Sequence, residues 1–493
     1  MASCLRSTLD RRTFDVVVIG GGINGAALFH TLSRAGYRVL VVDGSDFGSG
    51  TSQGSTMLIW GGLLYLRNLE LGTVWRLCAS RDRLIHAQPT DVRPATVKWV
   101  PQPGGRGRAL VQSAVTAYWL MGLGRRARPH FVRDFPERAM LNHGGPRGAL
   151  SYEEGALEAS DARFVLSWIL DAEREEAVAR NYTRLEHAAF DHAARQWRLD
   201  VRDTLDDTTA TISARLVINA AGGWTDDLNR SAGIVTPYHH VLSRGVSIAV
   251  PRDSRHATHL VFDMPNGDSL TLAPWGPVSL WASTDSVHGS MHEARQIDRR
   301  DVEHLLESLN QQLRTPYSMR DIVSVRCGVR PLPARRGQHV QGGAANLTRH
   351  HRIVADTSRP WISVFGGKLS GCVGLADEVR ARVRGTLGDG HVTLGGERAA
   401  EPPSMVSFPG LDATHVDPAW SATHEHCRTL DDYLRRRTNI AQWTPREGFG
   451  RTFEHLDRIR EIAHAIRADS AADADVATAH QRVTAEWQRL FNC

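Results

Sequence analysis

Residues 15–43 read DVVVIGGGINGAALFHTLSRAGYRVLVVD, and this stretch decides the fold. The short apolar run at 15–19 is typical of a strand that is buried on both faces. Glycines follow directly, and then a helical segment that we expect to end near Ala35, because Gly36 is a natural helix stop. The run YRVLVV at 37–42 indicates a second buried strand. The order of strand, helix and strand predicts a β-α-β unit.

The glycines between the first strand and the helix form the pattern GxGxxG, with Gly20, Gly22 and Gly25. The first permits a tight turn, the second lets the backbone approach a pyrophosphate, and the third lets helix and strand pack closely. Asn24 lies in the same turn and is included among the predicted cofactor-binding residues. Asp43 ends the second strand, where a carboxylate accepts hydrogen bonds from ribose hydroxyls and disfavours a 2′-phosphate. The motif predicts a dinucleotide site and leaves FAD and NAD both open.

Length, charge and cysteine usage describe an ordinary globular protein. A chain of 493 residues exceeds what one core usually serves, so two or three structural units are expected. The net charge of +5 comes from basic residues spread along the chain. It suits anionic small molecules or an anionic membrane face, and no nucleic-acid module pattern occurs. The six cysteines show no CxxC or metal spacing, so reduced thiols and a cytoplasmic location are expected.

The remaining pattern is mixed. We expect a helix over 152–180, strands over 197–201, 214–218 and within 246–284, and a glycine-led helix over 365–379. A Pro- and Gly-rich linker is expected over 396–420, and beyond it an apolar helical face formed by Leu456, Ile459, Ile462 and Ile466. The apolar stretch 109–123 is too short to span a bilayer. It predicts an amphipathic or core helix, and peripheral contact of this helix with the inner face of a membrane is left open.

Several ordered segments resemble one family, and they are GGGINGA at 20–26, TSQGSTMLIWGGLLYL at 51–66, SDARFVLSWILDA at 160–172, VINAAGGW at 217–224, STD at 283–285, CGVRPL at 327–332, FGGKLSG at 365–371 and TLDDYLRRRT at 429–438. The chain thereby resembles the FAD-dependent glycerol-3-phosphate dehydrogenases and oxidases, which are part of the D-amino-acid-oxidase-like flavoprotein superfamily. The resemblance implies FAD as the cofactor. It also implies a mixed α/β fold, in which a Rossmann-like FAD domain is interleaved with a sheet-rich substrate domain and followed by a helical C-terminal domain.

The resemblance also implies the domain boundaries. The FAD domain is expected to be discontinuous, over 15–90, 175–235 and 320–395. The substrate domain is expected over 91–174 and 236–319. The linker over 396–420 would then lead to the helical domain at 421–493.

The same resemblance implies the site residues. The expected cofactor-binding residues after Asp43 are Thr51, Ser52, Thr56, Leu58, Gly222, Gly367, Leu369 and Ser370. Lys368 is the expected cation near the flavin pyrimidine edge, where it would stabilise the negative charge of the reduced ring. Arg330 would bind an anionic group of the substrate bidentately, and Tyr65 and Trp60 would lie close to the flavin.

The chain departs from the family pattern at the predicted substrate pocket. Where the family has a lysine, a histidine and an arginine, this chain has Met57, Trp60 and Leu64. A further family histidine corresponds to Ser247, and two threonines correspond to Ser370 and Gly371. The loss of one charge-assisted phosphate bond costs about 1.5–3 kcal/mol. We therefore expect a substrate other than glycerol 3-phosphate: an alcohol or amine with one anionic group, or a larger and less polar molecule.

The predicted reaction moves a hydride from a carbon that bears OH or NH to flavin N5, and the electrons then pass to a quinone or to O2. The base is left open between Tyr65, His259 and water. The alternatives are an amino- or imino-acid oxidase, a flavin oxidase that tailors a natural product, and a flavin-holding protein without catalysis.

Two further features of the sequence are interpreted as structural. The histidines at 239–240, 350–351, 424 and 426 have no third ligand at helical spacing, so no metal site is expected and they are interpreted as solvated or core residues. The run Arg435, Arg436 and Arg437 is interpreted as the solvated face of a helix.

Overall fold

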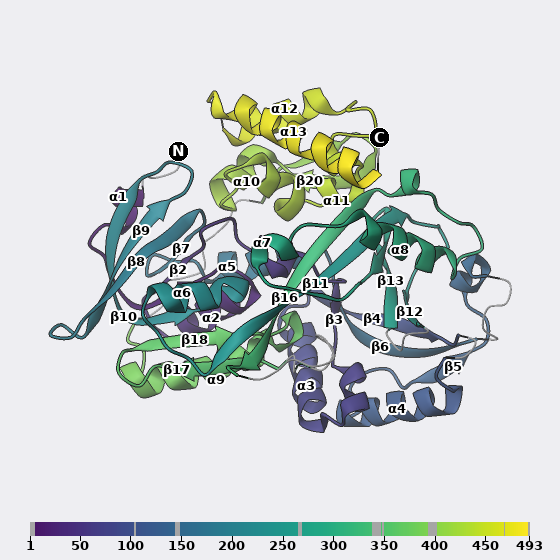
Figure 1. Cartoon of the computed structure of the whole chain (residues 1–493), viewed down its shortest axis with the longest axis horizontal. Helices are drawn as coiled ribbons and strands as arrows, with labels where there is room; N and C mark the ends of the chain where they lie inside the picture. Colours follow the sequence, from purple (N-terminus) through teal and green to yellow (C-terminus); the bar gives the residue numbers. More distant parts are fainter. Residues whose placement is uncertain are drawn as a thin grey trace.

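The fold consists of two large β-sheets and a mainly helical C-terminal domain that lies across both of them (Figure 1). The structure is a computed structural model, and it describes residues 5–102, 105–142, 148–264, 269–337, 347, 350–392, 402–467 and 469–491. This mixed α/β architecture confirms the predicted fold class.

The first sheet contains the predicted β-α-β unit. Strand β1 (Thr13–Ile19) lies parallel to β10 (Thr209–Asn219) and to β2 (Val39–Val42). The sheet has the order β17-β18-β10-β1-β2-β7, with β8 and β9 extending from β10. Its other strands are β7 (Ala177–Arg180), β8 (Thr183–Asp191), β9 (Gln196–Asp203), β17 (Arg352–Ala355) and β18 (Trp361–Phe365).

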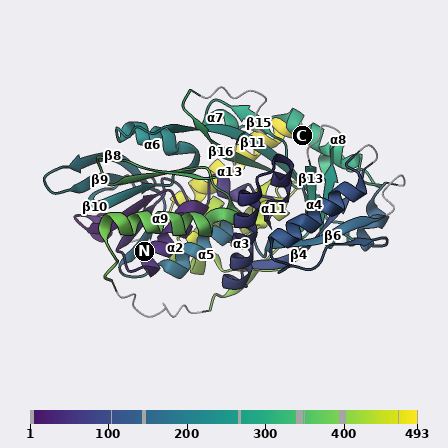
Figure 2. The same ribbon diagram turned by 90° about the horizontal axis from the view of Figure 1, so that it is seen from below.

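The apolar run of β1 is buried on both faces, as its sequence predicts. Val16 and Val18 pack with the helices α2 (Ile23–Arg34), α5 (Asp161–Ala172) and α9 (Cys372–Leu387). Val17 and Ile19 point to the opposite face, where they pack with residues of α1 (Leu5–Leu9), β9 and β10. Figure 2, seen from below, shows α2, α5 and α9 next to one another, and all three pack with the same face of the first sheet. The packing of α2 on this face of the sheet therefore positions the glycine turn, which joins the carboxyl end of β1 to α2.

The second sheet has the order β15-β11-β14-β13-β12-β4-β6-β3, with β16 paired to β11 and β5 paired to β6. Its strands are β3 (Leu58–Ile59), β4 (Val92–Val100), β5 (His130–Val132), β6 (Ala149–Leu157), β11 (Tyr238–Pro251), β12 (His259–Asp263), β13 (Ser269–Trp275), β14 (Val278–Ala282), β15 (Ser286–His288) and β16 (Ser324–Arg335). Helix α8 (Arg299–Asn310) packs on one face. Helices α3 (Leu71–Ala87) and α4 (Arg108–Met121) pack around β4 and β6. Short helices α6 (Thr225–Ser231) and α7 (Met291–Ala294) complete the two sheet regions.

The single helix predicted over 152–180 is wrong. The segment forms the end of β6, then α5, then β7, because β6 pairs along its length with β4 and cannot also be helical. Ser160 begins α5 by accepting a hydrogen bond from the Arg163 amide. The tertiary pairing of the sheet thus overrides the local helical pattern.

Two predicted domain boundaries also differ from the structure. Helix α5 packs with α2 on the first sheet, although its residues were assigned to the substrate domain. Strand β16 pairs with β11 over its whole length and belongs to the second sheet, although 320–395 was assigned to the FAD domain. The hydrophobic periodicity of a strand or helix does not reveal which element it packs against. The domain boundaries were therefore inferred from the resemblance alone.

The predicted linker contains regular structure. Residues 402–420 form the hairpin of β19 (Met405–Phe408) and β20 (Leu411–Val416) and the start of α10 (Pro418–His424), and residues 396–401 lie outside the described residues. Pro409 and Gly410 mark the hairpin turn, not a flexible connection. Helices α11 (Ile440–Trp443), α12 (Leu456–Ile466) and α13 (Ala471–Phe491) then share one apolar core, and α12 carries the apolar face predicted from the sequence.

Candidate functional site

The glycine turn between β1 and α2 has no room for side chains. A Cβ added to Gly25 would lie 1.7 Å from the Gly20 carbonyl oxygen, and one added to Gly20, whose φ is +103°, would lie 2.6 Å from the Ala220 oxygen. Gly22 caps α2, and no acidic residue lies in the first turn of that helix. The turn thus presents backbone N–H groups and the positive end of a helix dipole, which together suit a pyrophosphate.

Asp43 lies beside this turn, at the end of β2. One carboxylate oxygen accepts a hydrogen bond from the Gly21 amide at 2.7 Å, and the other accepts one from the Ser45 amide at 2.8 Å. Burial raises the pKa of Asp43 to about 6, so the group is mostly ionised at neutral pH. Each oxygen keeps a lone pair for a ribose hydroxyl.

The loop over 44–56 joins the glycine turn to β16. The Gly48 amide donates to the Gly21 oxygen at 3.0 Å, and the Ile23 amide donates to the Ser52 hydroxyl at 3.0 Å. The Thr51 hydroxyl donates its proton to the Val329 oxygen, so only its lone pairs remain for a ligand. The side chain of Thr56 is half-buried and forms no hydrogen bond to the described residues.

The segment Gly366–Lys368 lies against the same glycine turn. Asn24 donates from Nδ2 to the Gly366 oxygen at 2.9 Å, although 342 positions separate the two residues. The Gly366 amide donates to Nε2 of His240 at 3.0 Å, so this peptide is held from both sides. Gly367 has a φ of +104°, and a Cβ there would lie 2.8 Å from Asn24 Nδ2. Our sequence interpretation missed His240 as a support, because only the pairing of β11 with β16 brings it near Gly366.

Lys368 follows the two glycines and lies over Tyr65. Its ammonium nitrogen is 4.2 Å from the centroid of the Tyr65 ring. Burial lowers the pKa of Lys368 to about 8, and no acidic neighbour among the described residues offsets that effect. The Tyr65 hydroxyl is buried without a hydrogen-bond partner in the described residues. Leu369 and Ser370 form the short 3₁₀ turn η7 (Leu369–Gly371) that leads into α9, which agrees with the predicted glycine-led helix.

Arg330 lies on β16 opposite Ser243 of β11. Its guanidinium donates to the Ser283 hydroxyl at 2.7 Å and to the Ser243 hydroxyl at 3.4 Å, and it lies 3.9 Å from the Asp285 carboxylate. A Cβ on Gly245 would lie 2.5 Å from Nη2 of Arg330, so that glycine makes room for the guanidinium. The STD segment at 283–285 is one of those that carry the resemblance, but its contacts with Arg330 depend on the fold and were not predicted from the sequence.

The residues that depart from the family pattern occupy different surroundings. Met57 and Ser247 are buried, while Trp60 is half-buried and packs with Leu58 in an apolar cluster. The Leu64 side chain is 51% exposed, so it can face a ligand or solvent. Gly222 has a φ of +57° and open space at its Cβ position.

Two further histidines, His259 and His426, have environments of their own. His259 is buried beside His256 and Arg93, and its burial lowers its pKa to about 3, which makes it a poor candidate for the base left open above. His426 pairs with Glu173 at 3.0 Å. No cluster of three or more His, Cys, Asp or Glu side chains within the described ranges could hold a metal ion.

The interpretation of the arginine run as a solvated face is wrong. Arg436 and Arg437 are buried and pair with the buried carboxylate of Asp46, and Arg435 pairs with Glu447. The sequence could not reveal this, because the partner Asp46 lies about 390 positions away.

The residues fit the cofactor that the resemblance implies. The glycine turn and Asp43 suit the pyrophosphate and the ribose. Two buried atoms without a hydrogen-bond partner in the described residues lie farther along the same site, the Asn24 Oδ1 atom and the Tyr65 hydroxyl, and the ammonium group of the half-buried Lys368 lies over the Tyr65 ring. Buried polar groups normally have partners, so their grouping indicates a polar ligand at this position.

Comparisons with known proteins agree with this geometry. A family model described as FAD dependent oxidoreductase matches residues 15–370. A glycerol-3-phosphate dehydrogenase of Mycobacterium leprae is 26% identical over 96% of this chain and 88% of its own length.

Solved structures share the fold. The glycerol-3-phosphate dehydrogenase from Bacillus halodurans complexed with FAD aligns with a TM-score of 0.70 at 19% identity, covering 98% of this chain and 96% of that chain. A glycine oxidase from Bacillus cereus aligns with a TM-score of 0.55 at 15% identity, covering 79% of this chain and 100% of that chain. The resemblance read from the sequence is confirmed: the chain belongs to the FAD dependent oxidoreductase family, and its cofactor is FAD.

Proposed function

We propose that this enzyme oxidises a carbon that bears a hydroxyl or amino group, in a substrate whose single anionic group is bound by Arg330. The observation that carries the proposal is the position of Arg330 relative to the Gly366–Lys368 segment. Pro331 and Pro333, which follow Arg330 on β16, lie against Gly366: a Cβ there would be 2.8 Å from Pro333 and 3.5 Å from the Pro331 oxygen. The backbone of β16 beside Arg330 therefore lies close to the segment that carries Lys368, and we propose that a substrate anchored at Arg330 extends towards Lys368.

FAD supplies the electron-accepting ring of this reaction when it is bound. The charge of Lys368 would favour the reduced ring, because a fixed cation in a water-poor site stabilises nearby negative charge strongly. Arg330 would orient the substrate through its planar fork, and Ser283 and Ser243 hold that fork in place. The substrate proton would leave to water, because a neutral phenol such as Tyr65 is a poor proton acceptor and burial lowers the pKa of His259 to about 3.

We propose further that glycerol 3-phosphate is a poor substrate. Leu64 is apolar where the family has an arginine, and Arg330 already has a carboxylate, Asp285, at 3.9 Å. The charge of Arg330 is partly compensated by Asp285, so this single cation would bind a dianion weakly. It would be sufficient to bind a monoanion. Anaerobic mixing of the FAD-loaded protein with a panel of phosphomonoesters, hydroxy acids and amino acids would test this. Bleaching of the flavin absorption by monoanions, and slow bleaching by glycerol 3-phosphate, would support the proposal. Rapid bleaching by glycerol 3-phosphate at micromolar concentration would refute it.

A second candidate is the oxidation of an amino or imino acid. The proximity of Arg330 and Asp285 favours this candidate. Arg330 can bind the carboxylate of an amino acid, and Asp285 beside it can bind the ammonium group. Bleaching by amino acids, but not by their hydroxy-acid analogues, would select this candidate.

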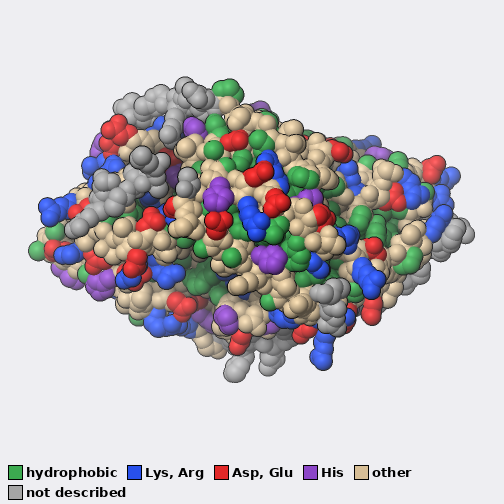
Figure 3. All heavy atoms as spheres, turned by 90° about the horizontal axis from the view of Figure 1, so that it is seen from above, with side chains coloured by type: hydrophobic (Ala, Val, Ile, Leu, Met, Phe, Trp, Pro, Cys, Tyr) green, Lys and Arg blue, Asp and Glu red, His purple; other side chains and the backbone are tan. Residues whose placement is uncertain are grey.

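We also propose that the electron acceptor is a membrane quinone and that α3 and α4 contact the membrane. Exposed apolar side chains lie on these two helices and beside their ends: Leu69, Leu71, Trp75, Leu110, Leu120 and Leu123. Residues 92–133 contain eight Lys and Arg residues and no Asp or Glu; Arg93, Lys98, Arg106 and Arg126 pair with carboxylates from other segments, whereas Arg108, Arg125, Arg128 and Arg133 are exposed. By contrast, acidic and basic side chains are interspersed on the face in Figure 3. Apolar side chains framed by positive charge suit an anionic lipid surface.

No helix in the described parts of the chain has the length and apolar character needed to cross a bilayer. Sedimentation with anionic vesicles would test the proposed contact. We expect Leu110→Ser combined with Leu120→Ser to reduce the bound fraction severalfold, and equal binding to neutral and anionic vesicles would contradict the proposal. Quinone reduction that is faster than peroxide production would support the quinone, whereas the reverse would select O2.

A further inference from the structure

The C-terminal domain inserts a turn of arginines into the first sheet region. The π-helical turn η8 (Asp432–Arg437) carries Arg436, which is 4% exposed, and Arg437, which is 5% exposed. Arg436 donates from Nε to Asp46 at 2.5 Å, and Arg437 donates from Nη2 to the other Asp46 oxygen at 2.9 Å. Asp46 itself is completely buried. Buried ion pairs thus join the turn η8 to the loop that contains Asp46, although the two segments are far apart in the sequence.

Further hydrogen bonds complete this cluster. The Asn181 amide donates to Asp46 at 2.8 Å, Arg436 also pairs with Asp432 at 2.8 Å, and the Tyr182 hydroxyl donates to Asp432 at 2.6 Å. The two arginines hold the pKa of Asp46 at about 2, so the carboxylate stays ionised at every physiological pH. A buried charge of this kind depends strongly on its partners, because removing one of them leaves an uncompensated charge.

Asp46 belongs to the loop that forms part of the predicted cofactor cradle. Asp43 lies three residues before it, and Phe47 and Gly48 after it contact Gly21 of the glycine turn. The other end of the loop is reached as well, since Arg436 Nη1 lies 3.3 Å from the side-chain oxygen of Gln53, which follows Ser52. The arginine turn therefore contacts the loop on both sides of the segment that faces the cofactor.

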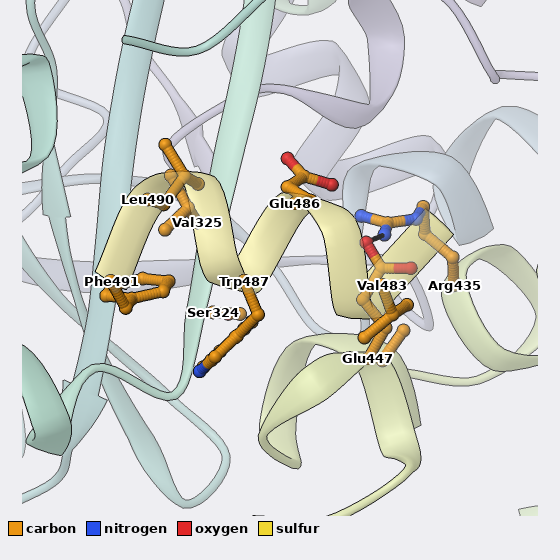
Figure 4. Close-up of a pocket in the computed structure, with 10 residues that line it drawn as sticks. Ser324, Val325, Arg435, Glu447, Val483, Glu486, Trp487, Leu490 and Phe491 are labelled. Carbon is orange, nitrogen blue, oxygen red and sulfur yellow. Dashed lines mark hydrogen bonds and ion pairs between the residues drawn. The ribbon is translucent and has the colours of Figure 1, made fainter. Parts of the chain in front are cut away.

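The third arginine of the turn has a different partner. Arg435 points into the crevice beneath α13, where it meets Glu447, and Glu486 lies nearby (Figure 4). Ser324 and Val325 of β16 line the far side of this crevice. Arg435 forms no hydrogen bond or ion pair with the loop over 44–56, although it belongs to the same turn, is the same residue type and is half-buried. It is therefore a matched control.

We propose that the C-terminal domain is a clamp for the cofactor: docking of Arg436 and Arg437 on Asp46 and binding of FAD stabilise one another through the loop over 43–53. FAD binding requires one arrangement of this loop, and the arginines favour that same arrangement. Two ligands that select one conformation are coupled, and the coupling is reciprocal. The inference rests on FAD as the cofactor and deepens the proposed function without depending on the substrate.

The first test measures FAD affinity in variants of the full chain by flavin fluorescence. We expect Arg437→Gln to weaken FAD binding about tenfold or more, within the usual range of coupling between two sites. Arg437→Gln combined with Asp46→Asn removes both partners of the same contact, so the affinity of the double variant should be about as low as that of Arg437→Gln alone, and the two losses should not add. Arg435→Gln should leave the affinity unchanged. An equal loss of affinity in Arg435→Gln would overturn the proposal, because it would show a general effect of domain stability.

The second test needs no substitution and remains decisive if Arg437→Gln does not fold. Hydrogen exchange is compared in the wild-type chain with and without FAD. Reciprocity predicts faster exchange of the amides over 432–443 once FAD is removed, with little change in α12. Unchanged exchange over 432–443 would overturn the proposal. A protein that binds FAD and is bleached by substrate, yet shows neither effect, would refute the clamp and leave the proposed function intact.

Discussion

The ammonium group of Lys368 lies 4.2 Å from the centroid of the Tyr65 ring. The two residues are separated by about 300 positions, and they meet because the Gly366–Lys368 segment returns to the glycine turn through Asn24. The Lys368 cation contacts the face of the Tyr65 ring, and burial lowers the pKa of Lys368 to about 8. The charge of Lys368 therefore changes within an accessible pH range.

This pKa predicts the pH dependence of flavin reduction. As the pH rises through about 8, the protonated fraction of Lys368 falls, so the rate of flavin reduction should fall as well. Lys368→Arg keeps its charge and should lose this alkaline limb, while Lys368→Met should be about 100-fold slower at neutral pH. Stopped-flow measurements of substrate-dependent bleaching from pH 6 to about 10 would check this. An identical alkaline limb in Lys368→Arg would exclude Lys368 as its origin.

Arg330 should determine binding of the substrate anion. Arg330→Met removes a charge-assisted contact worth about 1.5–3 kcal/mol, so the KM for an anionic substrate should rise roughly ten- to a hundredfold. Arg335→Met is the matched control, because Arg335 lies on the same strand but is exposed. Steady-state kinetics would compare the two variants. A similar KM in Arg330→Met and the wild type would show that the anion binds elsewhere.

Leu64 should exclude phosphate dianions from the pocket. Leu64→Arg restores the arginine of the family pattern, and the exposure of this side chain means that the substitution should cost little stability. The kcat/KM for glycerol 3-phosphate should rise about tenfold or more, since one charge-assisted bond is gained. Leu69→Arg, at another exposed leucine, tests whether added charge alone has the effect. No gain over Leu69→Arg would argue against Leu64 as the determinant.

Two buried histidines should make the fold sensitive to acid. Burial lowers the pKa of His256 to about 4 and that of His259 to about 3, against about 6.5 in the unfolded chain. Below pH 6.5 the unfolded chain therefore binds more protons, and the free energy of unfolding should fall as the pH drops towards 4. His259→Leu should remove on the order of 2–3 kcal/mol of this fall. Denaturant unfolding at several pH values would measure it, with exposed His86→Leu as the control. Parallel pH profiles for the wild type and His259→Leu would contradict the assignment.

The local sequence was sufficient for the elements whose partners are adjacent in the chain. The run at 15–19, the glycines after it and Asp43 predicted β1, the turn and the end of β2, because each of these features is fixed by neighbouring residues. The helix over 152–180 was predicted wrongly, because β6 is held by β4, about 60 positions before it. Long-range strand pairing has no local signature.

The charged residues illustrate the same limit. A run such as Arg435–Arg437 normally covers a solvated face, and only the fold brings Asp46 to it. His240 was likewise interpreted as a core or solvated histidine, and its bond to Gly366 depends on the pairing of β11 with β16. Arg330 and Lys368 were selected through resemblance, whereas their contacts with Ser283 and Tyr65 required the structure.

The most direct measurement is the titration of the cofactor-free protein with FAD, followed by visible absorption and flavin fluorescence. The account predicts that each chain takes up one FAD and becomes yellow, and that Gly25→Val, whose Cβ would meet the Gly20 oxygen, takes up none. A folded wild-type protein that stays colourless at saturating FAD would contradict the assignment of the glycine turn, and the roles of Lys368 and Arg330 with it.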